Sequence, residues 1–219
     1  MKQALVYFNA LADALLATQV SNHSGAALSL VLGVEHLLSS TALAQNGEKG
    51  SGKIILVGNG GSAAIASHVQ NDLCKAVGVR AMVFNEPPLL TALTNDVDYA
   101  SAFQHLVGLW AEPGDLLLAI SSSGRSENII RAAKTSRALG CSVATFSGFD
   151  SDNPLRRLGD LNFYVACHSY GLVELAHGAL LHYITDRAML ERATIASGSQ
   201  MTETNHMAHS PRRNTKENG

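Results

Sequence analysis

The sequence predicts an α/β fold, because five short apolar runs alternate with segments of helical periodicity. The runs are rich in Val, Ile, Leu and Phe and have the length of buried strands. Strands that are apolar throughout and separated by helices indicate a parallel sheet covered by helices on both faces. The expected strands are 53–57, 80–84, 115–120, 142–146 and 161–165.

A helical extension is expected before the sheet. Leu5, Phe8, Leu11 and Leu15 recur at helical spacing, which predicts an amphipathic first helix. The other expected helices are 25–38, 63–76, 102–110, 127–139 and 172–192. Residues 45–52 read as a polar, glycine-rich connector. From Thr194 the chain is polar and without periodicity, so we expect one domain over 1–193 and a disordered tail over 194–219.

Composition excludes several classes of protein. The chain has 219 residues, 46% hydrophobic and 16% charged, a balance typical of a globular domain. Its net charge of −2 argues against a nucleic-acid partner, and no apolar stretch reaches the length of a membrane span. Three cysteines, Cys74, Cys141 and Cys167, lack metal-type spacing. An odd number of scattered cysteines favours reduced thiols and a cytoplasmic location.

Two loops have the composition of anion sites. The first, GNGGS at 58–62, joins an expected strand to a helix. Its glycines allow close approach of a ligand to the backbone, and Ser62 could cap the helix or donate to a ligand oxygen. A tight strand-to-helix turn explains the same residues. The second, SSSGRS at 121–126, offers four hydroxyls at a helix N-terminus, which favours an anion site over a serine-rich linker.

The positions of the two loops strengthen the anion-site interpretation. They follow the first and third expected strands, which are neighbours at the topological switch point of a common doubly wound order. The first loop lacks the lysine of a nucleotide P-loop, and no G-x-G-x-x-G occurs. These absences argue against a P-loop nucleotide site and against a dinucleotide site.

Several segments together resemble the SIS (sugar isomerase) domain and, within it, the phosphoheptose isomerases. They are GNGGSAA at 58–64, TALTND at 91–96, GDLLLAISSSGRS at 114–126 and the final helix with His182. The resemblance implies a flavodoxin-like, five-stranded parallel sheet flanked by helices, and a homotetramer. It also implies conversion of sedoheptulose 7-phosphate to D-glycero-D-manno-heptose 7-phosphate in heptose biosynthesis. Some members of the family bind zinc.

The resemblance assigns roles to individual residues. As metal ligands it implies His68, Asp72, Glu174 and His182, of which Asp72, Glu174 and His182 are also the implied catalytic residues. The implied substrate-binding residues are Asn59, Gly60, Gly61, Ser62, Asn95, Asp96, Ser121, Ser122, Ser123 and Ser126. Three positions depart from the family pattern: Asp72 replaces a glutamate, Glu174 a glutamine and Ser122 a threonine.

The departures bear on the chemistry. Isomerisation through an enediol needs an acid and a base near two adjacent carbons. His68 and Asp72 are four residues apart and share a helix face; Glu174 and His182 are about two turns apart. Together they offer two nitrogen and two oxygen ligands, which suits zinc. Catalysis without metal and a plain surface pair of His68 with Asp72 remain alternatives. Glutamate reaches further than aspartate, so the base is hypothesised to have moved from Asp72 to Glu174.

Two other functions compete with the isomerase. Some SIS proteins are non-catalytic and associate with a replication-initiator protein, whereas others sense sugar phosphates as regulators. Such regulators usually carry an appended DNA-binding domain, for which this sequence offers no room. His182 and the nearby acidic residues favour retained chemistry.

Overall fold

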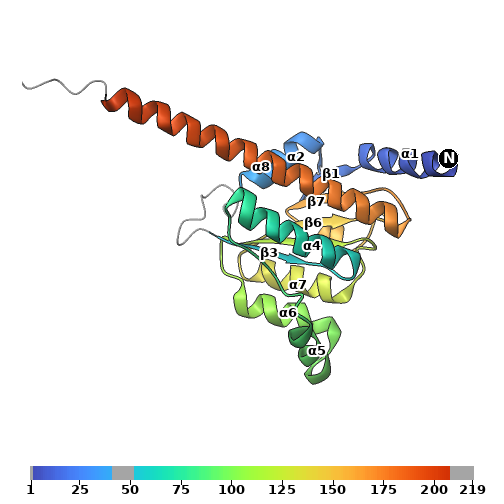
Figure 1. The fold of residues 1–219 in the computed structure, drawn as a ribbon. Coiled ribbons are helices and arrows are strands. Elements are labelled where there is room, and N and C mark those ends of the chain that lie inside the picture. The colour runs from blue at the N-terminus through green and yellow to red at the C-terminus, as the bar shows by residue number, and fades with distance from the viewer. Residues whose placement is uncertain (1, 41–51, 208–219) are drawn as a thin grey trace, which may run out of the picture.

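The computed structural model describes residues 2–40 and 52–207, with side chains as far as Thr194 (Figure 1). The elements in chain order are α1 (Lys2–Leu16), β1 (Gln19–Asn22), β2 (Ala27–Leu28), α2 (Leu30–Leu38), β3 (Ile54–Val57), α4 (Gly61–Asp72), the π-helical turn η1 (Leu73–Val77), β4 (Ala81–Val83), α5 (Pro87–Asp96), α6 (Tyr99–Trp110), β5 (Leu116–Ser121), α7 (Glu127–Ala138), β6 (Ser142–Ser147), the 3₁₀ turn η2 (Leu155–Arg157), β7 (Leu161–Tyr164) and α8 (Tyr170–Met207).

The strands form one sheet in the order β2-β1-β7-β6-β5-β3-β4. The strands from β3 to β7 run parallel to one another, which confirms the α/β class and the positions of the five expected strands. β3 and β5 are hydrogen-bonded neighbours, although β4 lies between them in the chain. The chain therefore changes direction across the sheet between β3 and β5, and the two glycine- and serine-rich loops follow these adjacent strands, as expected at a switch point.

The N-terminal segment is not purely helical, so that part of the prediction was wrong. A single helix was expected over 25–38, but the strand β2 occupies the first part of this segment. The helix α2 begins only at Leu30, with Ser29 as its N-cap residue. β1 pairs antiparallel with both β2 and β7 and extends the sheet to seven strands. β1 has only four residues and gains its stability from β7, a partner about 140 positions away that no local pattern reveals.

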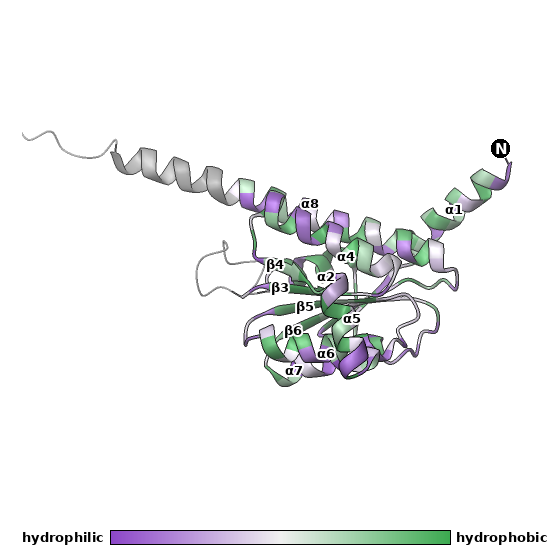
Figure 2. Ribbon diagram, turned by 60° about the horizontal axis from the view of Figure 1, so that its bottom comes forward, coloured by the Kyte–Doolittle hydropathy of each residue, from purple (hydrophilic) through white to green (hydrophobic). Residues whose placement is uncertain are grey.

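Helices cover both faces of the sheet (Figures 1 and 2). Side chains of β3 point alternately to the two faces of the sheet, and each face has its own hydrophobic core. Ile54 and Leu56 pack in the core beneath α4 and α8, whereas Ile55 and Val57 pack in the core beneath α6 and α7. The loops at the ends of the strands thus lie where both helical layers meet.

The last helix is longer than expected. It was predicted to end near Arg192, but α8 continues to Met207, so the tail expected from Thr194 is helical over its first part. Residues 208–219, where the rest of that tail falls, and most of the expected connector at 45–52 lie outside the described residues. The assignment of residues 1–193 to a single domain stays a prediction.

Two further expectations concern the whole chain. No helix in the described part of the chain is both long and apolar enough to cross a membrane. The three cysteines are free thiols, in agreement with the reduced state expected from their number and spacing.

α5 was not among the expected helices. Its two prolines stand in the first turn, where a missing N–H group is tolerated.

Candidate active site

The loop after β3 leads directly into α4. Gly60 is the N-cap residue, with a positive φ of 53°, and it offers no side chain to cap the helix. Ser62 is buried inside the first turn and makes no capping hydrogen bond, so the capping role considered for it is not what the structure shows. The N–H groups of this first turn therefore have no side-chain cap, as an anion-binding helix end requires.

The serine loop lies beside it, after β5. Ser121 donates a hydrogen bond to Ser126 (3.2 Å), and Ser123 accepts one from the backbone N–H of Arg125. The hydroxyl of Ser122 is buried and has no hydrogen-bond partner among the described residues. Because an unpaired buried hydroxyl is costly, Ser122 is the group in this loop that a ligand oxygen would satisfy.

The guanidinium of Arg125 is paired with two carboxylates. It lies 3.3 Å from Asp150 and 3.6 Å from Asp152, both in the loop after β6. His168 also contacts Asp150, and its hydrogen bond, followed by that of Arg125, lowers the pKa of this carboxyl. The donors that face a ligand in the serine loop are therefore neutral hydroxyl and N–H groups.

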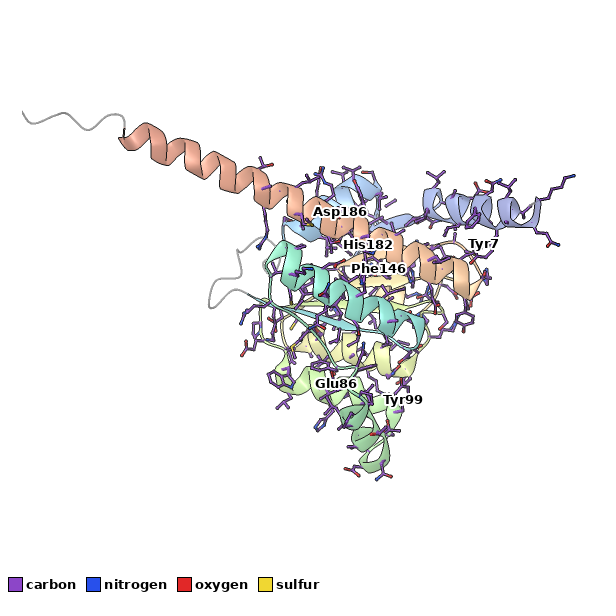
Figure 3. The ribbon with its side chains drawn as sticks, viewed as in Figure 1. Tyr7, Glu86, Tyr99, Phe146, His182 and Asp186 are labelled. Carbon is purple, nitrogen blue, oxygen red and sulfur yellow. The ribbon has the colours of Figure 1, made fainter. Side chains whose placement is uncertain are left out.

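Three of the four expected metal ligands converge between α4 and α8. Oδ2 of Asp72 lies 3.3 Å from Nε2 of His68 and 3.6 Å from Nδ1 of His182. The two imidazole rings meet edge to face, with centroids 5.0 Å apart. One ligand atom from each of the three residues lies within 4.8 Å of the others. Both histidine side chains are more than half exposed, so the cluster is open to solvent. His182 is labelled on α8 in Figure 3.

Glu174 does not join this cluster. The ligand atoms that lie within 4.8 Å of one another come from His68, Asp72 and His182, and Glu174 is not among these residues. Its carboxylate instead lies against Gly61, at the position that a Cβ atom there would occupy. The positive end of the α4 dipole favours a carboxylate at this place.

Glu174 and His182 nevertheless line the same open pocket. The pocket has a volume of about 570 Å³ and lies over α4 and α8, with Tyr7 of α1 and Gly61 also on its wall. It connects the N-terminus of α4 with the histidine cluster. A substrate that fills it would meet an acidic group at one end and the His68, Asp72 and His182 cluster at the other.

Asn95 and Asp96 are not brought into contact with the other expected site residues. They end α5, they are exposed, and Asn95 donates a hydrogen bond to Asp96 (2.9 Å). In the described part of the chain neither side chain bonds to a residue of the two loops. Their proposed role in substrate binding stays a prediction.

Sequence reasoning missed two residues that contact Asn59. Asn128, the second residue of α7, exchanges two hydrogen bonds with the Asn59 amide, and Tyr99, the first residue of α6, donates a third. Neither residue belongs to a motif, and an asparagine in the first turn of a helix carries no signal of such a contact. The contacts arise because the folded chain brings the first residues of α6 and α7 beside the loop that contains Asn59.

The fold and this arrangement of loops and side chains define a sugar-phosphate-binding α/β protein, and comparison with known proteins agrees. The family model described as SIS domain matches residues 35–148. The chain is 34% identical to the phosphoheptose isomerase of Mycobacterium tuberculosis over 151 residues. This aligned region covers 64% of this chain and 74% of that protein. It is 34% identical over 156 residues to the phosphoheptose isomerase of Aliarcobacter butzleri, covering 68% and 82% of the two chains. This protein belongs to the SIS domain family.

A solved structure shows the same architecture. The phosphoheptose isomerase of Neisseria gonorrhoeae superposes with a TM-score of 0.70 at 24% sequence identity. The match covers 85% of this chain and 97% of that one. At this identity the likeness concerns the fold, and it includes nearly the whole of the other chain.

Proposed function

We propose that this protein isomerises sedoheptulose 7-phosphate to D-glycero-D-manno-heptose 7-phosphate. The observation that carries the proposal is the convergence of His68, Asp72 and His182, from two different helices, beside a pocket that also contains Glu174. Membership of the SIS family and relatives named phosphoheptose isomerase support the same reaction. The buried, unpartnered hydroxyl of Ser122 supports phosphate as the anchoring group.

The reaction moves a proton between the first two carbons of the sugar. A base removes a proton from carbon 1 while the oxygen on carbon 2 gains one, which forms the enediol. Return of a proton to carbon 2, with loss of the hydroxyl proton on carbon 1, leaves the aldehyde. Both steps need an acid–base group on one side of the substrate and stabilisation of a developing oxyanion on the other.

Glu174 is the better candidate for the base. Asp72 is held between two imidazole nitrogens, whereas Glu174 lines the pocket and no ion pair to it occurs among the described residues. We therefore assign proton transfer to Glu174 and keep Asp72 as a partner of the histidines. A comparison of turnover in Glu174→Gln and Asp72→Asn tests this; a negligible effect of Glu174→Gln would exclude the assignment.

His68, Asp72 and His182 fit zinc. Two imidazole nitrogens and a carboxylate oxygen are the ligand types that zinc prefers, and three protein ligands leave one position open, as in catalytic sites. When bound, zinc would supply Lewis-acid stabilisation of an oxyanion. The fourth ligand expected from the sequence, Glu174, is not needed for such a site. Catalysis by these residues without metal is the alternative.

The decisive assay is incubation of the purified protein with sedoheptulose 7-phosphate and detection of an aldose phosphate. His182→Ala is expected to abolish turnover and to lower the zinc content measured by elemental analysis. His105→Ala, an exposed histidine on α6 in the other helical layer, serves as the matched control. No product from the wild-type protein would favour the non-catalytic SIS function instead. Activity that survives complete removal of metal would exclude the Lewis-acid role.

We also propose a homotetramer located in the cytoplasm. The support for assembly is the apolar surface of α1, where Leu5, Val6 and Phe8 are more than half exposed. A helix with such a surface is expected to pack against another copy of the chain.

A further inference from the structure

The side chain of Asn59 is held by contacts from two helices. Its Nδ2 donates to Oδ1 of Asn128 (3.0 Å), and its Oδ1 accepts from Nδ2 of Asn128 (2.8 Å). Oδ1 also accepts a hydrogen bond from the hydroxyl of Tyr99 (2.8 Å). Asn59 belongs to the loop before α4, whereas Asn128 and Tyr99 begin α7 and α6.

The orientation of the two amides follows from the backbone. The N–H group of Ile129 donates to Oδ1 of Asn128 (3.0 Å), so the atom at that position must be an acceptor. The amide nitrogen of Asn59 must then face this oxygen, and its own oxygen faces Nδ2 of Asn128. The hydroxyl of Tyr99 completes the set as a donor. All these groups are therefore satisfied in one arrangement only.

These contacts join the two helical layers at the ends of the strands. α4 packs on one face of the sheet, and α6 and α7 pack on the other, so the sheet lies between them. Asn128 is buried, and the carbonyl of Asn59 accepts from the N–H groups of Ser62 and Ala63 in the first turn of α4. A shift of the Asn59 side chain would thus move the N-terminus of α4 relative to the serine loop, which leads into α7.

We propose that Asn128 and Tyr99 are positioning residues that hold the glycine loop before α4 in register with the serine loop. They act through Asn59 and need not touch the substrate. A sugar phosphate that contacts both loops depends on their relative placement, whereas inorganic phosphate seated in the serine loop does not. This inference rests on the proposed function, because that function requires one ligand to reach both loops.

The test compares two ligands by calorimetry, sedoheptulose 7-phosphate and inorganic phosphate. Tyr99→Phe removes one hydroxyl from a side chain that is 46% exposed, so the fold should be retained. It is expected to weaken binding of the sugar phosphate by about threefold to tenfold, the range for one hydrogen bond, and to leave phosphate binding unchanged. KM for the sugar phosphate should rise by the same factor.

Asn128→Leu is the second variant. It keeps the approximate size of the side chain and adds no charge beside the serine loop, but it removes both hydrogen bonds to the Asn59 amide. We expect the same selective loss as for Tyr99→Phe. Because both residues act through Asn59, the double variant should lose less than the product of the two single effects.

Asn162→Ala is the matched control. Asn162 is a buried asparagine of β7 with its own hydrogen bonds to Thr145 and Gly159, and it lies away from both loops. Its loss should lower the melting temperature without changing either affinity. Equal weakening of both ligands in the Tyr99 and Asn128 variants, or no weakening of the sugar phosphate, would overturn the inference alone. A wild-type protein that binds neither ligand would overturn the proposed function and the inference with it.

Discussion

Two histidines on α8 occupy opposite environments. His182 is half exposed beside Asp72, whereas His177, less than two turns earlier, is fully buried against Phe146. Nε2 of His177 donates to the carbonyl of Ser147 (3.2 Å), and its Nδ1 has no hydrogen-bond partner among the described residues.

Burial lowers the pKa of His177 to about 4, despite the hydrogen bond to Ser147 that acts in the opposite direction. The unfolded chain then binds a proton more readily than the folded one between about pH 6.5 and pH 4. Stability is expected to fall by about 3 kcal/mol as the pH drops through this window. Urea denaturation at several pH values measures it. His177→Gln should flatten this part of the profile, and an unchanged slope in the variant would contradict the assignment.

Among the residues of the serine loop, Ser122 is expected to contribute most to phosphate binding. Since its buried hydroxyl has no protein partner, Ser122→Ala removes no hydrogen bond from the folded protein. We expect stability to stay within about 0.5 kcal/mol of wild type, while sugar-phosphate affinity falls about tenfold or more. Calorimetry and thermal denaturation give the two numbers. Ser136→Ala, another buried serine on α7, should leave affinity unchanged.

The serine loop depends on the loop that follows β6. Gly124 has a positive φ of 61°, and a Cβ atom there would collide with the side chain of Asn153. Asn153 is fully buried and bonds to Ser147, Gly148 and Asp150, so it cannot move aside without breaking these bonds. The shape of the anion site is therefore set by two loops that follow neighbouring strands.

Gly124→Ala is expected to destabilise the protein by about 2 kcal/mol or more, because it combines backbone strain with a clash. It should also weaken sugar-phosphate binding severely. Gly114→Ala is a matched control: Gly114 has a φ of 91° in the turn before β5, but nothing lies within 4 Å of a Cβ there. The control should cost about 1 kcal/mol and retain binding. Retained affinity in Gly124→Ala would show that Asn153 does not shape the loop.

At the scale of the whole molecule, α1 and α8 present surface that one chain does not cover. α1 buries only Ala14 fully, although Figure 2 shows it rich in hydrophobic residues. α8 has 38 residues and projects beyond the sheet in Figure 1. Both features are expected where helices of several copies pack together.

Light scattering at micromolar concentration should therefore give the mass of a homo-oligomer, with a tetramer expected. Leu5→Glu combined with Phe8→Glu places two charges one turn apart on the exposed surface of α1 and should shift the protein toward smaller species. The same changes on a monomer would leave the mass unaltered. A wild-type mass of 23.1 kDa would contradict the proposed assembly.

Local patterns along the chain were sufficient to predict most of the strands and helices. The five parallel strands were predicted because each is a continuous apolar run, and the helices between them because their apolar residues recur at helical spacing. The placement of the two loops at neighbouring strands followed from a common strand order. His68 and Asp72 were paired because four residues on a helix separate two side chains by only about 6 Å.

Features that depend on partners far apart in the chain could not be predicted from local pattern. β1 forms a strand because it pairs with β7, and the four residues Gln19–Asn22 carry no local pattern that predicts this pairing. Glu174 stands apart from the cluster of His68, Asp72 and His182 because its carboxylate lies against Gly61 at the start of α4. Asn128 and Tyr99 reach Asn59 from two other helices. Such contacts join residues 40 and 69 positions apart, and periodicity along a chain carries no information about them.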